Sequence, residues 1–237
     1  MAYTYLTHAA KVAGATNTVT TTGVDTSGAD LLVVFGVQAS GGTYGTISDS
    51  VGGNSNTWTA LTSLYQSGTT FHNEIQAWYC QGSLHVGASH TFTLSGGSSS
   101  FGSDTYPQIA MLAFSGSAAS PVIAENGAGA QSASSLQTGS VDPGANNDAL
   151  FVSGCATANG KTATVGSSFT NVDTLLESGG YGIDSAYFIQ GSASALNPTW
   201  TPNSGTCDLA CCLAALKVSG GAAATVWTPL FPLIGLQ

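Results

Sequence analysis

The stretch LLVVFGV, residues 31–37, decides the fold class of this chain. It lies within TTGVDTSGADLLVVFGVQA (residues 21–39), where an Asp-containing turn precedes the apolar run. A short apolar run bounded by turn residues is typical of a β-strand with both faces buried. A second stretch, TGSVDPGANNDALFVSGCA (residues 138–156), repeats this order of turn and apolar run. The sequence therefore predicts two buried strands of the same kind.

Further blocks recur in the same order along the chain, which indicates an internal repeat. The spacing between matched blocks decreases toward the C-terminus, so the second copy is predicted to have shorter loops. The matched blocks are NTWTALTSL (56–64) with SSFTNVDTLL (167–176), AWYCQG (77–82) with AYFIQG (186–191), HTFTLSGG (90–97) with PTWTPNSG (198–205), and YPQIAMLAFSG (106–116) with CDLACCLAALKVSG (207–220).

The individual blocks read as strands. HTFTL alternates polar and apolar residues, as in a strand with one wet face, whereas EIQAWYC and IAMLAF are typical of core strands. LACCLAALKV is helix-like, but it occupies the place of a strand of the first copy, so a strand is predicted. No pattern indicates a βαβ crossover. The expected fold is all-β, an antiparallel β-sandwich of jelly-roll type built from two pseudo-repeats.

The repeat also sets the expected domain organisation. Residues 1–116 are predicted to form the first β-sandwich repeat and residues 138–220 the second, packed as one compact unit. Residues 117–137 are small and polar around a short PVIA segment, so a crossover or linker is predicted there. Residues 221–237 are predicted to be an apolar C-terminal arm.

The charge composition excludes several classes of protein. Lys and Arg together number 3, the net charge is −9, and charged residues make up 6% of the chain, against roughly 25% in ordinary globular proteins. Nucleic-acid binding by phosphate neutralisation and polybasic membrane binding both need clustered basic residues, so neither is expected. The sequence contains no apolar run of about 18 residues, so no membrane span is predicted. The expected surface is one of Ser, Thr, Asn, Gln and Gly.

The N-terminus shows no signal-peptide pattern, although the composition resembles that of extracellular proteins. Virion proteins combine these properties, because they are made in the host cytoplasm and leave by lysis. The expected location is therefore the virion surface. Non-classical export to the extracellular surface, or a trimmed sequence, is the alternative.

Motifs for catalysis, cofactors and metals are not recognised. GCATANGKT (154–162) resembles a phosphate loop, but its glycine spacing is wrong and a hairpin tip is expected instead. Glu74 and Asp184 hold similar places in the two copies, and strand-edge solvation explains them better than a glycosidase acid pair. The histidines are expected to be exposed loop residues without metal; they are His8, His72, His85 and His90.

Cysteine usage gives no disulfide framework, because the five residues are odd in number and irregular in spacing. On a strand, Cys211 and Cys212 point to opposite faces, whereas Cys207 and Cys211 can share one. Free buried thiols are expected. The alternative is one disulfide between Cys155 and Cys207, Cys211 or Cys212.

Aromatic residues offer candidates both for the core and for ligand binding. Trp58 begins a strand, and Phe169 takes its place in the second copy, so both are expected to be buried. Asp49, Asn54 and Asn56 precede Trp58, but they lack the spacing of an EF-hand calcium loop, and turn capping is expected. Tyrosines in or beside loops are the candidates for glycan stacking: Tyr44, Tyr65 and Tyr106.

Five strings carry a resemblance to a known group of proteins: VDTSGADLLVVFGV, ISDSVGGNSNTWTAL, AWYCQG, HTFTLSGG and YPQIAMLAFSG. Together they resemble a loosely defined group of β-sandwich proteins encoded by tailed bacteriophages and some bacteria. The resemblance covers residues 17–156 well and the remainder weakly. The chain departs from the group's S-D-S-x-G-N-T-W pattern by extra residues between Asp49 and Trp58. The resemblance implies a virion or surface protein and brings no catalytic residues.

The C-terminal arm contains VWTPLFPLIGLQ (226–237), which has no charge. Pro229 and Pro232 forbid a regular helix, and the segment is too short to span a bilayer. An apolar segment of this kind must be covered by protein. Docking on a neighbouring subunit or another virion protein is expected, and folding back over its own sandwich is the alternative. The predicted contact residues are Val226, Trp227, Leu230, Phe231, Leu233, Ile234 and Leu236.

The expected function is that of a non-enzymatic phage virion structural protein, most simply one that decorates or cements a capsid. Its expected partners are neighbouring copies of itself and other capsid or tail proteins. The alternative is a tail-fibre or adhesin-type module that binds a surface glycan.

Overall fold

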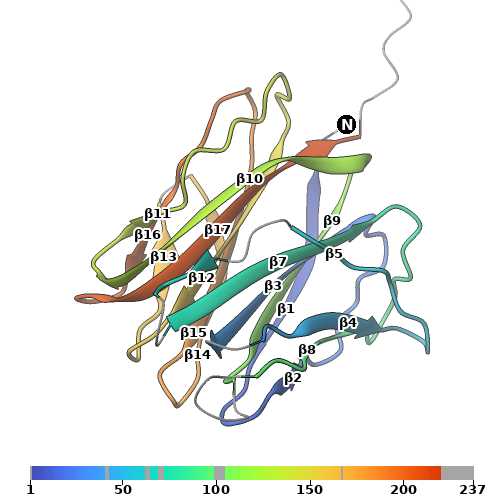
Figure 1. Cartoon of the computed structure of the whole chain (residues 1–237). Helices are drawn as coiled ribbons and strands as arrows, with labels where there is room; N and C mark the ends of the chain where they lie inside the picture. Colours follow the sequence, from blue (N-terminus) through green and yellow to red (C-terminus); the bar gives the residue numbers. More distant parts are fainter. Residues whose placement is uncertain are drawn as a thin grey trace, which may run out of the picture.

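The computed structural model describes residues 2–40, 43–61, 65–68, 72–98, 105–166 and 168–219. Over these residues the chain is all-β and contains no helix, and every strand pairing is antiparallel (Figure 1). The predicted all-β, antiparallel class is therefore confirmed.

The first half of the chain forms one large and one small sheet. The large sheet has the order β1-β9-β3-β7-β5, with β6 paired to β7, and the small sheet has the order β2-β8-β4. The strands are β1 (Thr4–Val12), β2 (Thr18–Thr20), β3 (Leu31–Ser40), β4 (Thr46–Ser50), β5 (Thr59–Ala60), β6 (Tyr65–Gln66), β7 (His72–Gln81), β8 (Thr91–Ser95) and β9 (Gln108–Ser115).

The second half forms another such pair of sheets. The large sheet has the order β10-β17-β12-β15-β14, and the small sheet has the order β11-β16-β13. The strands are β10 (Ser117–Ala133), β11 (Leu136–Gln137), β12 (Leu150–Thr157), β13 (Ala163–Val165), β14 (Thr170–Leu176), β15 (Gly182–Ile189), β16 (Thr199–Pro202) and β17 (Cys207–Val218).

The segment 117–137 differs from the sequence-based expectation. Instead of a crossover or linker it forms β10 and β11, which belong to the large and small sheets of the second half. β10 pairs along β17, with Glu125 opposite Ala214. Its many Ser, Ala and Gly residues have little strand preference of their own, so pairing with β17 explains the strand. LACCLAALKV is the strand β17, as predicted.

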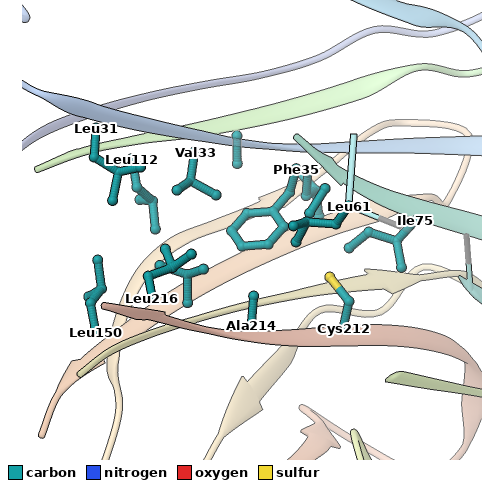
Figure 2. Close-up of a cluster of buried hydrophobic side chains, with 14 of the residues drawn as sticks. Leu31, Val33, Phe35, Leu61, Ile75, Leu112, Leu150, Cys212, Ala214 and Leu216 are labelled. Carbon is teal, nitrogen blue, oxygen red and sulfur yellow. The ribbon is translucent and has the colours of Figure 1, made fainter. Parts of the chain in front are cut away.

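The two large sheets pack face to face around a shared core (Figure 2). Side chains on β3 and β9 meet side chains on β12 and β17; those labelled in Figure 2 include Leu31, Val33, Phe35, Leu112, Leu150, Cys212, Ala214 and Leu216. Two further clusters fill the space between each large sheet and its small sheet. Each large sheet is therefore buried on both faces.

Strand β3 shows why the apolar runs are continuous. Leu31, Val33 and Phe35 belong to the central cluster, whereas Leu32 and Val34 belong to the outer cluster beneath the small sheet. Successive side chains of a strand point to opposite faces, so a strand with two buried faces needs apolar residues at every position. The predicted burial of both faces of residues 31–37 is confirmed.

Glycines allow two close approaches between the halves. A Cβ on Gly154 of β12 would lie 2.6 Å from the Phe35 ring, so Phe35 packs directly on the β12 backbone. A Cβ on Gly129 of β10 would collide with the carbonyl oxygen of Gln66 on β6. Strand β6 is thereby held against the other half of the molecule.

Strand β1 also joins the two halves. His8 forms a hydrogen bond with Asp173 of β14, with 2.7 Å between Nδ1 and Oδ1. Tyr5 stacks on Tyr187 of β15, with ring centroids 4.8 Å apart. The N-terminal strand of the first half is thus fixed to the edge of the second large sheet.

Candidate functional site

The most conspicuous polar arrangement is a buried chain of Asp49, His90 and Thr26. His90 Nε2 lies 2.8 Å from Asp49 Oδ2, and His90 Nδ1 lies 2.9 Å from Thr26 Oγ1. The order carboxylate, imidazole, hydroxyl is that of a hydrolase triad. His90 and Thr26 have no exposed surface, and Asp49 is 7% exposed. A substrate therefore has no access to the hydroxyl, and the arrangement is structural.

Further hydrogen bonds show which segments the Asp49–His90–Thr26 arrangement connects. The Asn56 backbone N–H donates to Asp49 Oδ1 over 2.8 Å, and the His85 backbone N–H donates to Asn56 Oδ1 over 2.8 Å. The Gly87 N–H donates to the Thr26 hydroxyl over 3.2 Å. Three connections at this end of the first half, β2–β3, β4–β5 and β7–β8, are thus tied to one another. The expected turn capping is correct for Asp49, which accepts from the Asn56 amide, whereas Asn56 bonds to the β7–β8 connection.

The electrostatics of Asp49 follow from these contacts. Burial raises the pKa of the Asp49 carboxyl, but hydrogen bonds from His90 and Asn56 outweigh it and hold the pKa below its ordinary value. The carboxylate is therefore ionised at neutral pH and accepts several donors at once.

The expectation of exposed loop histidines is wrong for His90, which is fully buried. His8 is exposed but lies on β1 rather than in a loop, and His85 is an exposed loop residue, as expected. The side chain of His72 lies outside the described residues. Within the described part of the chain, no three His, Cys, Asp or Glu side chains are grouped so that they could hold a metal ion.

Glu74 and Asp184 are also buried, at 2% and 0% exposure, so strand-edge solvation was the wrong explanation. Glu74 Oε1 accepts a hydrogen bond from Gln66 on β6, and Asp184 Oδ2 accepts one from the Ala163 amide on β13. On β7 the alternation places Glu74 on the face of Trp78, toward the outer cluster of the first half. Asp184 faces the small sheet of the second half, so the two carboxyl groups do not face a common cleft.

Asp184 makes stability depend on pH. Burial raises its pKa to about 8, although the Ala163 amide donates a hydrogen bond to the carboxyl group. From about pH 4 to pH 8 the folded state keeps a proton that the unfolded chain releases, so the free energy of unfolding falls as pH rises. The wild-type free energy of unfolding should fall on the order of 3 kcal/mol between pH 5 and 8, and we expect Asp184→Asn to remove most of this fall.

Urea unfolding at several pH values measures this effect. The exposed Asp148→Asn is the matched control and should keep the wild-type pH dependence. An Asp184→Asn protein that loses stability between pH 5 and 8 as steeply as wild type would contradict the assignment.

The three tyrosines proposed for glycan stacking lie in different environments. Tyr44 donates from its hydroxyl to the Gly36 carbonyl over 2.6 Å and packs on Trp78, and burial raises its pKa well above the ordinary value. Tyr65 lies on β6 and packs against the central core. Tyr106 lies beside Tyr181, with ring centroids 5.2 Å apart, and both rings are half-buried. Tyr106 is therefore the candidate that has a second half-buried tyrosine ring beside it.

Trp58 and Phe169 hold corresponding places one residue before β5 and β14. Phe169 is buried, as predicted, and packs on Phe188. Trp58 is half-buried and lies edge-on to Phe92, so its predicted full burial is wrong.

All five cysteines are buried free thiols, so the expectation of free thiols is confirmed and the alternative of a disulfide is wrong for this structure. Cys155, Cys207 and Cys211 belong to the outer cluster of the second half, and Cys212 faces the central core. The predicted faces of Cys207, Cys211 and Cys212 are thus confirmed. Burial raises the pKa of Cys155 well above its ordinary value, which makes this thiol unreactive.

A groove of about 260 Å³ opens in the second half, between the approach to β14 and the approach to β16. Phe169, Leu196 and Pro198 supply apolar surface to it, and no charged residue lines it. The other lining residues are Gly166, Ser168, Asn197 and Thr199. Sequence reasoning did not find this groove.

The corresponding connection in the first half is longer. Residues 51–57 connect β4 to Trp58, whereas only residues 166–168 connect β13 to Phe169. In the first half, Asn56 of the longer connection bonds to Asp49 and His85. The shorter loops predicted for the second copy were the signal that could have indicated an open place here.

The segment GCATANGKT (154–162) forms the end of β12 and a turn at 159–160 before β13, with Asn159 and Gly160 at positive φ. The predicted C-terminal contact residues, 226–237, lie outside the described residues. The described residues contain no helix that is long and apolar enough to cross a membrane. No family model, curated protein or solved structure matches the chain.

Proposed function

We propose that this chain is a non-enzymatic structural protein of a phage particle, placed on the virion surface as a capsid decoration or cement protein. The sequence resemblance to phage-encoded β-sandwich proteins supports this proposal, as does the charge-poor, Ser- and Thr-rich composition. The observation that carries the proposal is the strand order of the two halves.

The two halves have matching strand orders. The order of the first large sheet, β1-β9-β3-β7-β5, matches strand for strand the order of the second, β10-β17-β12-β15-β14. The small sheets match in the same way, β2-β8-β4 with β11-β16-β13. In each half the first strand pairs with the last, and the last pairs with the third, as in a jelly roll. We infer two jelly-roll pseudo-repeats that pack through their large sheets. Jelly rolls recur in viral capsid proteins and lectins.

The chemistry of the described residues favours a structural role over catalysis. The chain Asp49–His90–Thr26 and the carboxyl groups of Glu74 and Asp184 are all shielded from solvent. A hydrolase activity that a single substitution at Glu74 or Asp184 abolishes would overturn the non-enzymatic assignment.

Counting copies per particle tests the proposed function. Particles purified from the source culture should contain the chain, and quantitative mass spectrometry should find hundreds of copies per particle. A few tens of copies would indicate a tail fibre. Absence of the chain from purified particles would contradict the proposal.

A second candidate function, glycan recognition by a tail fibre or adhesin, is supported by Tyr106 and Tyr181. Two adjacent half-buried rings can form a stacking platform for a sugar, and Tyr106 has a φ of 47°, a strained backbone conformation that clusters at binding sites. Binding on a glycan array that both Tyr106→Ala and Tyr181→Ala abolish would favour this function.

A further inference from the structure

The groove and the end of the last strand lie at the same end of the second large sheet. Leu216, near the end of β17, is opposite Leu150 at the start of β12, and Leu150 is opposite Ile189 at the end of β15. Thr170, the first residue of β14, is opposite Tyr187 near the same end. Phe169 of the groove directly precedes β14, so the chain leaves β17 at the end of the sheet where the groove opens.

The distance from β17 to the groove is short compared with the length of chain that follows β17. Strands β12 and β15 lie between β17 and β14, and three strand spacings amount to about 14 Å. Residues 220–237, which lie outside the described residues, have a maximum reach of about 60 Å. The sequence that follows Ser219 can therefore reach a groove of its own copy or of an adjacent one.

The chemistry of the groove fits part of this sequence. Phe169, Leu196 and Pro198 present apolar surface, and the rim residues Ser168, Asn197 and Thr199 are polar but uncharged. Residues 226–237 contain seven large apolar side chains, including Trp227 and Phe231, and no charge. An apolar aromatic side chain is thus better matched to the groove than a charged ligand.

The size of the groove bears on which copy supplies this segment. The groove measures about 260 Å³ and is open toward solvent, so it covers only part of a twelve-residue segment. In a single copy the other apolar residues of the segment would need a further covering surface, because proteins rarely leave large apolar patches in water. A second copy supplies that surface.

We propose that the groove of one copy binds the C-terminal segment 226–237 of a second copy, with Trp227 or Phe231 as the aromatic anchor. Because groove and chain exit lie at the same end, one two-fold contact between these ends exchanges both segments at once. This inference rests on the proposed function, since it names the self-association by which the protein would assemble.

Photo-crosslinking in the full chain tests the inference. The residue p-benzoylphenylalanine replaces Asn197 at the groove, and in a control protein it replaces the exposed Asn203 after the other end of β16. Equal amounts of isotopically heavy and light protein are mixed, equilibrated and irradiated. Trypsin cleaves after Lys161 and Lys217, so the groove and the C-terminal segment fall on separate peptides, 162–217 and 218–237.

The expected result is heavy–light crosslinks between peptides 162–217 and 218–237, at least tenfold more abundant from position 197 than from position 203. Trp227→Ala together with Phe231→Ala should remove these crosslinks and shift the protein to monomer in light scattering. Crosslinks within single chains only, crosslinks equal at both positions, or none to 218–237 would each overturn the inference. Particle composition does not enter this assay, so a protein that is absent from particles yet gives heavy–light crosslinks would contradict the proposed function alone.

Discussion

Phe35→Ala is expected to lower the free energy of unfolding by roughly 3–5 kcal/mol, the usual cost of removing a fully buried Phe side chain. Phe35 is 1% exposed and lies in the core shared by the two large sheets. Its ring packs on Gly154 of the other half, so the cavity would loosen the contact between the halves (Figure 2). Urea unfolding monitored by near-ultraviolet circular dichroism measures the loss. The control Leu176→Ala removes a side chain that is 43% exposed and should have a much smaller effect.

A paired substitution tests the specific contact between Phe35 and Gly154. Gly154→Ala alone should destabilise the protein, because its Cβ would lie 2.6 Å from the Phe35 ring. Phe35→Leu replaces that ring with a smaller, more flexible side chain, so the double variant should be more stable than the sum of the single effects predicts. Gly191→Ala is the matched control, since a Cβ there meets nothing within 4 Å. Strict additivity would show that the two halves do not meet in this way.

Asp49→Ala is expected to cost about 3–5 kcal/mol, because it removes the carboxylate partner of a buried histidine. His90 would keep Thr26 on Nδ1 but would lose the acceptor on Nε2, and the Asn56 amide would lose its acceptor as well. The loops tied to Asp49 should open, so their backbone amides should exchange faster with deuterium. Thermal and urea unfolding measure the stability change.

An exposed aspartate in a turn serves as the control for this substitution. Asp142→Ala removes a carboxylate that accepts from the Gly144 amide in the second half, and it should cost less than 1 kcal/mol or so. A loss for Asp49→Ala as small as that of the control would show that His90 does not depend on this carboxylate.

Pattern and periodicity predict those parts of this fold that depend on local sequence. The run at residues 31–37 predicts a strand buried on both faces because it has an apolar residue at nearly every position. Strand β10 has no such signal, since Ser, Ala and Gly dominate it, and it exists because β17 offers a partner. A single sequence does not show that pairing.

The candidate sites depend still more on contacts between distant residues. The alternation in HTFTL gave one overlooked signal, because it puts His90 on the same face as Phe92 and Leu94, which are both fully buried. Its partner Asp49 is far away in the sequence, so the pair emerges only when β4 and β8 come together. The groove likewise arises from two loops that are distant in the sequence, and only the shorter spacing of the second copy hinted at it.

The shared central core also constrains how the chain is made. Val33 and Phe35 of the first half are covered by residues such as Ala214 and Leu216, which the ribosome adds much later than the first half. Until then, the inner face of the first large sheet has no partner and is open to aggregation. Contacts so distant in sequence slow folding. The first half should therefore acquire its native packing only after β17 has been synthesised, and products truncated before β17 should be insoluble.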